Sequence, residues 1–218
     1  MEANAKECHL SVPFYPNVTA DGNRCFQVSM QSVLKYFLGK EFDAEYLDKI
    51  TGRKLGFNTY TFQIVPFLHE AGLKVRYFSS VDPEPFLEGE PFIRRHYGKD
   101  AEVYLKLTDM DAMMSAVKKI LKTKLFEKRI LSLPELEAHL LQGHVPMVLL
   151  DWHKITGHHG PYQGHFVVMT GFDAKNIYFH DSGPDSPTPN YKVDKKLFVE
   201  AWNANGTDND VVIVYGKS

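Results

Sequence analysis

The sequence predicts an α+β domain in which a helical half packs on an antiparallel β-sheet half. Before Gly143, apolar residues recur at three- and four-residue spacing, which is the period of helices that bury one face. After Gly143, β-branched and aromatic runs are bounded by Gly, Asp and Asn, as is typical of strands. The 218 residues contain no internal repeat or linker, so we expect a single domain over 1–218 with its cleft between the two halves.

The helical half follows an extended segment over 10–20, where two prolines exclude the interior of a helix. Most of the expected helices have a polar residue that can cap the start or a glycine that can end the helix. Residues 82–107 mix Pro, Gly and charge without a clean period, and we predict no element there. The expected helices cover 25–38, 44–51 after the cap Asp43, 62–72 after the cap Thr59 or Thr61, 109–124, and the stretch 131–143, in which Ser132 is the cap and Gly143 the end.

The strands lie mostly in the second half of the chain, with one in the first. We expect the turn over 173–176 to join two of them as a hairpin. The expected strands cover 74–80, 145–152, 164–173, 176–183 and 210–216.

Composition limits the kinds of partner and compartment. The formal net charge is −2, so the chain offers no basic field for nucleic acid or an anionic membrane surface, and we expect neither as a partner. No stretch approaches the roughly 20 apolar residues of a membrane span, and residues 1–16 lack the apolar core of a signal peptide. Only two cysteines occur, which fits a reducing compartment, so we expect a cytoplasmic protein and assign no oligomeric state.

Cys25 stands at the start of the first expected helix, directly after a turn signal. The positive end of the helix dipole and the unpaired N–H groups of a first turn favour a thiolate over a thiol, and the neighbouring Arg24 acts in the same direction. This pattern predicts a nucleophile. The alternative is a small buried residue that begins a core helix, since free cysteine usually packs as an apolar side chain.

His165 and Asp181 supply the partners that a cysteine nucleophile needs. His165 begins one expected strand and Asp181 ends the next. If the two strands form a hairpin, these residues meet at one end of the sheet, where the carboxylate can orient the imidazole. The alternative is an ordinary strand histidine and an aspartate that ends a strand.

Several short motifs are distributed along most of the chain. The most specific are GHFVVMTGFD over 164–173 and HDSG over 180–183, while VPFYPN over 12–17 precedes Cys25. With this set, the chain resembles the papain-like cysteine peptidases of the bacteriocin-leader (double-glycine) peptidase type. The resemblance is thin in the middle of the chain, which predicts an insertion around 82–130.

The resemblance implies a role for each of these residues. Cys25 is the nucleophile, His165 its base and then its acid, and Asp181 the carboxylate that orients the imidazole. An oxyanion hole would combine the N–H of Cys25 with an upstream side chain. The family usually has Gln at that upstream position, and the candidates here are Asn17 and Asn23.

Four further residues are candidates for contact with substrate. Relatives carry small residues after the nucleophile, whereas Phe26 here places a ring where a substrate backbone would pass. We expect residues 153–163 to form a mobile glycine-rich flap over the cleft, with His158 and His159 touching substrate. Trp152, directly before this flap, is the fourth candidate, although a tryptophan there more often packs on the sheet.

Together these features predict a hydrolase, a peptidase or amidase, that forms an acyl-enzyme from a peptide or from a small amide or thioester. The same triad transfers the acyl group to an amine where the pocket excludes water, so an acyltransferase is one alternative. Another is a catalytically inactive peptide-binding module of the same fold. We expect no metal and no cofactor, because the histidines lack the paired spacing of zinc ligands and no nucleotide-binding glycine motif occurs.

Overall fold

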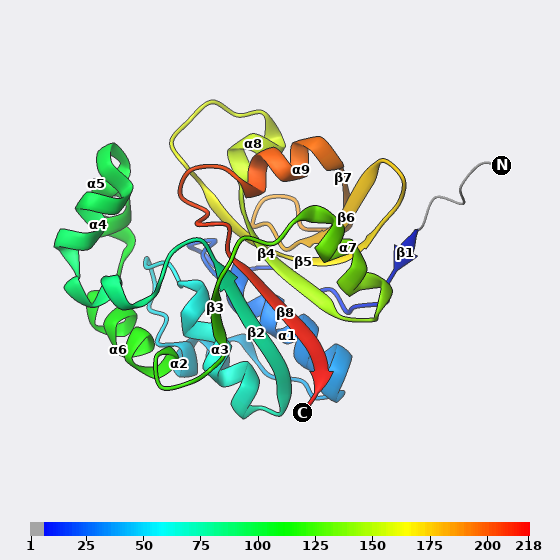
Figure 1. Ribbon diagram of the computed structural model, residues 1–218, viewed down its shortest axis with the longest axis horizontal. Coiled ribbons are helices and arrows are strands. Elements are labelled where there is room, and N and C mark those ends of the chain that lie inside the picture. The colour runs from blue at the N-terminus through cyan, green and yellow to red at the C-terminus, as the bar shows by residue number, and fades with distance from the viewer. Residues whose placement is uncertain (1–6) are drawn as a thin grey trace.

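A mostly antiparallel sheet of eight strands runs through the middle of the protein in the computed structural model, which describes residues 7–218 (Figure 1). The strands are β1 (Cys8–His9), β2 (Leu73–Ser79), β3 (Phe126–Lys128), β4 (Val145–Asp151), β5 (Gly164–Phe172), β6 (Asn176–Asp181), β7 (Thr188–Asp194) and β8 (Val211–Lys217). Their order is β3-β2-β8-β4-β5-β6-β7, and β1 pairs with the end of β5. The pair of β2 and β3 is parallel.

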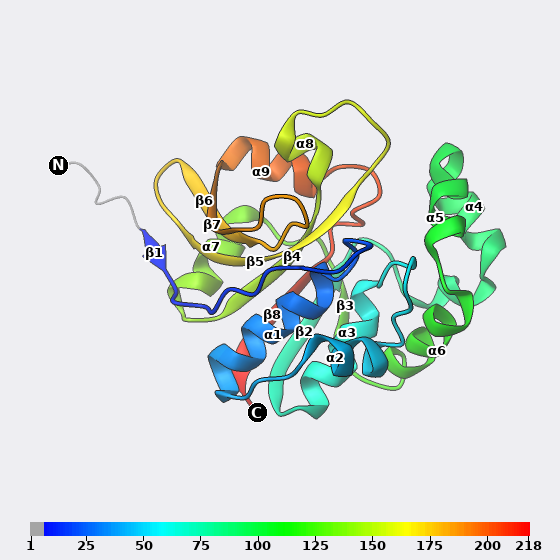
Figure 2. The ribbon, with the colours of Figure 1, turned by 180° about the vertical axis from the view of Figure 1, so that it is seen from behind.

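Helices cover both faces of this sheet, as the two opposite views show (Figures 1 and 2). Within residues 7–218, no helix is both long and apolar enough to cross a membrane. The helices are α1 (Cys25–Leu38), α2 (Ala44–Thr51), α3 (Thr61–Glu70), α4 (Glu90–Tyr97), α5 (Ala101–Leu107), α6 (Met110–Ile120), α7 (Leu133–Leu141), α8 (Trp152–Thr156) and α9 (Lys195–Trp202), with 3₁₀ turns η1 (Glu84–Glu88) and η2 (Gly98–Asp100).

The sheet separates two apolar cores. Alternate side chains of a strand point to opposite faces, so Phe166 and Val168 of β5 join the core under α1 and α3, while Val167 and Met169 join the core under α7 and α9. The α+β class is therefore confirmed. As expected, helices pack against the sheet. In addition, α7 and α9 cover its second face.

The first helices follow the sequence closely. Helix α1 begins at Cys25, and Asp43 caps α2 by accepting the N–H of Tyr46 at 2.6 Å. The prediction that Thr59 or Thr61 caps the third helix is wrong. Helix α3 begins at Thr61 with Tyr60 as its N-cap residue, because Oε1 of Gln63 reaches back to the N–H of Tyr60 at 2.6 Å.

The segment over 82–107, for which no element was predicted, is helical. Its turns η1, α4, η2 and α5 are short, and Gly89 and Gly98 interrupt them with φ of +67° and +55°. The 3.6-residue period therefore never lasts long enough to show in the sequence. Together with α6, these turns form a helical lobe over 84–120 that projects beside the sheet (Figure 1).

The hairpin prediction is confirmed, since β5 and β6 pair antiparallel and the N–H of Asp173 donates to the carbonyl of Asn176 at 3.0 Å. The strand expected over 145–152 is one residue too long, because Asp151 caps α8 by accepting the N–H of His153 at 3.1 Å. Strand β7 was not predicted. It is a largely polar edge strand paired with β6, and such strands lack an apolar alternation.

The core position of Phe166 gives a direct test of this arrangement. Phe166 is fully buried on the interior strand β5 and stacks on Phe26 with ring centroids 4.1 Å apart. We predict that Phe166→Ala lowers the free energy of unfolding by about 3–5 kcal/mol, because it leaves a cavity. The control Leu55→Ala, at a site 73% exposed, should change it by less than about 0.5 kcal/mol. Urea unfolding measures both, and equal midpoints for the two variants would contradict the arrangement.

Candidate active site

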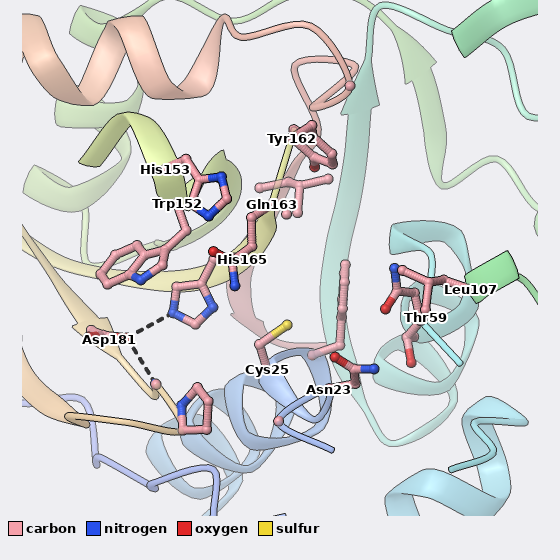
Figure 3. A pocket seen from close by; sticks show the side chains of 18 of the residues that line it. Asn23, Cys25, Thr59, Leu107, Trp152, His153, Tyr162, Gln163, His165 and Asp181 are labelled. Atoms are coloured by element: carbon pink, nitrogen blue, oxygen red, sulfur yellow. Dashed lines mark hydrogen bonds and ion pairs between the residues drawn. The ribbon is translucent and has the colours of Figure 1, made fainter. Parts of the chain in front are cut away.

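A cavity of about 770 Å³ opens where the N-terminus of α1 meets the start of β5 and the end of β6 (Figure 3). Cys25, His165 and Asp181 all line it. The helical lobe contributes one wall, and the segment over 152–163 contributes another. Residues from distant parts of the chain therefore converge on one hollow.

Cys25 occupies the first position of α1, and its side chain is partly exposed to the cavity. Among the described residues, no side chain caps the start of this helix, so the N–H groups of its first turn remain available. Figure 3 shows the sulfur close to the imidazole of His165, on the side turned away from Asp181. The positive end of α1 and the imidazole thus both face the sulfur.

Arg24 does not act on the sulfur as the sequence suggested, because other carboxylates balance its charge. Its guanidinium lies 2.6 Å from Asp48 and 3.1 Å from Glu45. The buried Arg53 joins this network and donates to the carbonyl of Asn23 at 3.1 Å. Arg53 therefore positions the loop that leads into Cys25, although it lies far along the chain and no motif marks it.

His165 and Asp181 are in direct polar contact at the end of the sheet. Nε2 of His165 lies 2.9 Å from Oδ1 of Asp181, and both residues are buried. The same carboxylate oxygen accepts the N–H of Gly183 at 2.8 Å, which fixes its orientation. With Nε2 engaged, Nδ1 is the ring nitrogen left to face Cys25 (Figure 3).

The electrostatics of His165 favour its charged form. Burial alone would lower the pKa of this imidazole, but the hydrogen bond to Asp181, followed by the interactions with Cys25, raises the pKa to about 9. His165 is therefore an imidazolium at neutral pH. An imidazolium beside a cysteine is the partner that stabilises a thiolate and can later protonate a leaving group.

The two asparagines proposed for the oxyanion hole have different surroundings. Asn17 is 2% exposed and lies outside the cavity, and its amide donates to the carbonyl of Gly22 at 2.6 Å. Asn23 lines the cavity beside Cys25, and among residues 7–218 its side-chain amide makes no hydrogen bond (Figure 3). The structure therefore brings Asn23, and not Asn17, to the sulfur.

The residues expected to touch substrate are also divided. Phe26 lines the cavity, but it is only 5% exposed and its ring stacks on Phe166 in the core, so little of the ring faces the cavity. Trp152 lines the cavity with its ring edge-on to His165, the centroids being 4.8 Å apart. His158 also lines the cavity, whereas His159 is exposed and lies outside the lining.

Several cavity residues have no signal in the sequence. Gln163 lies beside His165 in the structure and faces the same cavity (Figure 3). The cavity residues not singled out from the sequence include Tyr60, Tyr97, Tyr104, Tyr162, Gln163, Asp208 and Asp210.

Across the described part of the chain, no group of three or more His, Cys, Asp or Glu side chains is arranged to hold a metal ion.

Comparison with solved structures identifies the class of fold. A protein from Bacillus anthracis described as a C39-like peptidase matches with a TM-score of 0.52 and 15% identity, over 98% of this chain and 99% of that one. The chain therefore has the papain-like fold of the bacteriocin-leader peptidase type. At this identity the likeness establishes the fold alone.

Two other structures match with TM-scores of 0.49. One is the peptidase domain of Streptococcus ComA, a bi-functional ABC transporter of a quorum-sensing pathway, at 14% identity over 94% of this chain and 98% of that one. The other is a double-glycine-motif protease from an AMS/PCAT transporter, in complex with the leader peptide, at 13% identity over 95% of this chain and 94% of that one.

A family model described as guanylylate cyclase matches residues 24–214. By sequence, the chain belongs to this guanylylate cyclase family.

The role of Asp181 can be tested through the titration of His165. We predict a midpoint near pH 9 for His165 in the native protein, followed by its ring C–H signals in NMR spectra. Asp181→Asn removes the negative charge but keeps the shape, so the midpoint should fall by about one to three pH units. The control Asp185→Asn lies in the same cavity without touching the ring, and it should leave the midpoint in place. A midpoint near 6.5 in the native protein would contradict this electrostatic account.

Proposed function

We propose that this protein is a cysteine-nucleophile hydrolase, a peptidase or amidase, working in the cytoplasm through an acyl-enzyme on Cys25. The observation that supports this most directly is the cavity shared by a cysteine at a helix N-terminus and an imidazole held by a buried carboxylate. These three groups have the order of partners that acyl transfer requires. The fold match to a C39-like peptidase is consistent with the same chemistry.

In the proposed reaction, the sulfur of Cys25 attacks the carbonyl carbon of an amide, and a carbon–sulfur bond forms. The oxyanion accepts hydrogen bonds from the N–H of Cys25 and the amide of Asn23. The imidazolium of His165 then protonates the nitrogen, the carbon–nitrogen bond breaks, and the amine leaves. Water, losing its proton to His165, attacks the thioester and releases the acid together with the free thiolate.

The name of the family suggests a second candidate, the cyclisation of a nucleoside triphosphate. The charge of the cavity opposes it. Among the described residues that line the cavity, five are aspartates and none is Lys or Arg. A triphosphate carries several negative charges and is bound in proteins by Lys, Arg, the backbone N–H groups of glycine-rich loops, or a Mg²⁺ ion held on carboxylates. Among the described residues, no group of three or more His, Cys, Asp or Glu side chains is arranged to hold such an ion. The cavity therefore suits an amide better than a nucleotide.

A panel of peptides and small amides tests the hydrolase against the other candidates. We expect release of an amine that disappears in Cys25→Ala and persists in Cys8→Ala, because Cys8 lies outside the cavity. Release of an acylated amine when a second amine is added would indicate an acyltransferase. Binding without turnover would indicate a peptide-binding module, and cyclic nucleotide formed from GTP in Cys25→Ala would contradict the proposal.

The two asparagines give a sharper test of the oxyanion hole. We predict that Asn23→Ala lowers kcat by about 10²–10³, because a donor to the transition state is lost. Asn17→Ala should instead lower the free energy of unfolding by about 1–3 kcal/mol, since it leaves the carbonyl of Gly22 unpaired. Steady-state kinetics and urea unfolding of both variants separate the effects. A normal kcat in Asn23→Ala would remove this residue from the mechanism.

A further inference from the structure

The cavity extends beyond the catalytic residues to a second polar region at the loop before β8. Asp208 and Asp210 line the cavity there, and so do four tyrosines, Tyr60, Tyr97, Tyr104 and Tyr162. We call these six residues the acidic aromatic end. Its walls come from the start of α3, the helical lobe, the segment over 152–163 and the loop before β8.

The negative charge of this end is only partly compensated. Asp208 lies 2.9 Å from Nε2 of His96 and accepts the hydroxyl of Tyr97 at 3.0 Å. Asp210 accepts the hydroxyl of Tyr77 at 2.9 Å through one carboxylate oxygen. No Lys or Arg stands among the described residues that line the cavity, so no strong cation faces Asp210.

One buried hydroxyl here is left without a hydrogen-bond partner. Asp210 is 7% exposed, and the side chains of Thr61 and Ser79 lie close enough to its carboxylate to lower its pKa. Thr61 is 1% exposed and lines the same cavity, and its hydroxyl makes no hydrogen bond among the described residues. Buried polar groups are rarely left unpaired in native proteins, so this hydroxyl beside Asp210 points to a polar ligand group in this part of the cavity.

Burial and then the negative charge of Asp208 raise the pKa of Asp210 to about 7, against the opposing contacts with Thr61, Ser79 and Tyr77. A carboxylate in this position is costly to ionise while it faces no cation. A bound cation would favour the ionised form by direct attraction. The electrostatics thus agree with the geometry.

The tyrosines form a layered wall beside the two aspartates. Tyr97 and Tyr104 stack with centroids 3.6 Å apart, and Tyr104 stacks on Tyr162 at 5.7 Å. A Cβ at Gly206 would lie 2.2 Å from the hydroxyl of Tyr104, so only glycine lets the loop approach these rings. Aromatic rings with carboxylates nearby attract organic cations through the ring quadrupole and direct charge.

We propose that the acidic aromatic end is a specificity subsite for a cationic group of the substrate, an ammonium or guanidinium attached near the carbonyl that Cys25 attacks. This inference rests on the proposed function, because it places the subsite in the cavity of the hydrolase. The cation is carried either by a lysine or arginine side chain or by the free N-terminal ammonium of a peptide. Both have the same chemistry, and the subsite selects them over neutral groups of equal size.

Binding to Cys25→Ala tests the subsite separately from turnover. The probes are acetyl-glycyl-lysine amide, acetyl-glycyl-norleucine amide and glycyl-norleucine amide with a free N-terminus, and titration calorimetry measures each Kd. We expect the lysine probe or the free-amine probe to bind at least about tenfold more tightly than the acetylated norleucine probe, and whichever is tighter identifies the source of the cation. Equal Kd values for all three probes would overturn the proposal.

Substitutions locate the effect. In the Cys25→Ala background, Asp210→Asn should weaken the cationic probe about tenfold and leave the norleucine probe unchanged, while the cavity control Asp185→Asn should change neither. Because Asp210 is buried, Tyr104→Leu and Tyr104→Phe provide a second pair, of which only the first should weaken the cation. Unchanged binding in both Asp210→Asn and Tyr104→Leu would contradict the subsite. Cation binding without any acylation of native Cys25 would instead refute the hydrolase and keep the subsite.

Discussion

The hydrogen bond between Asp181 and His165 is the interaction on which the site depends. Burial alone would leave the imidazole neutral, and the carboxylate reverses this, so that a positive ring faces Cys25 at neutral pH. The sheet makes the contact, since His165 stands near the start of β5 and Asp181 ends β6, and a short hairpin joins the two strands. Burial of both groups costs desolvation, and removal of either one would leave the other buried without its partner, which is strongly destabilising.

The cavity combines this pair with an unusual distribution of charge. Its polar groups are aspartates, histidines, hydroxyls and amides, and in the described lining no Lys or Arg balances them. The two candidate substrates are a nucleoside triphosphate and an amide that carries a cationic group. An acidic wall repels phosphates and attracts cations, so this distribution of charge favours the amide. In our proposal, the acidic aromatic end binds a cationic group of the substrate, and Cys25, His165 and Asp181 act on its carbonyl.

The parts that were predictable from sequence are those determined by local patterns. The start of α1 at Cys25, the hairpin over 173–176 and the meeting of His165 with Asp181 all follow from turn residues and periodicity. The positioning role of Arg53 depends on contacts across the fold, and no short motif announces it. The helical lobe was missed because its helices are too short to display a period.

Selective alkylation of the two cysteines tests the central claim most directly. Chloroacetamide at pH 7, followed by peptide mapping, compares the rates at Cys25 and Cys8. Burial raises the pKa of the Cys8 thiol, whereas Cys25 faces the imidazolium of His165 and the N-terminus of α1. The account predicts modification of Cys25 at least about tenfold faster than Cys8, with the advantage reduced in Asp181→Asn. Slow and equal modification of both cysteines would contradict it.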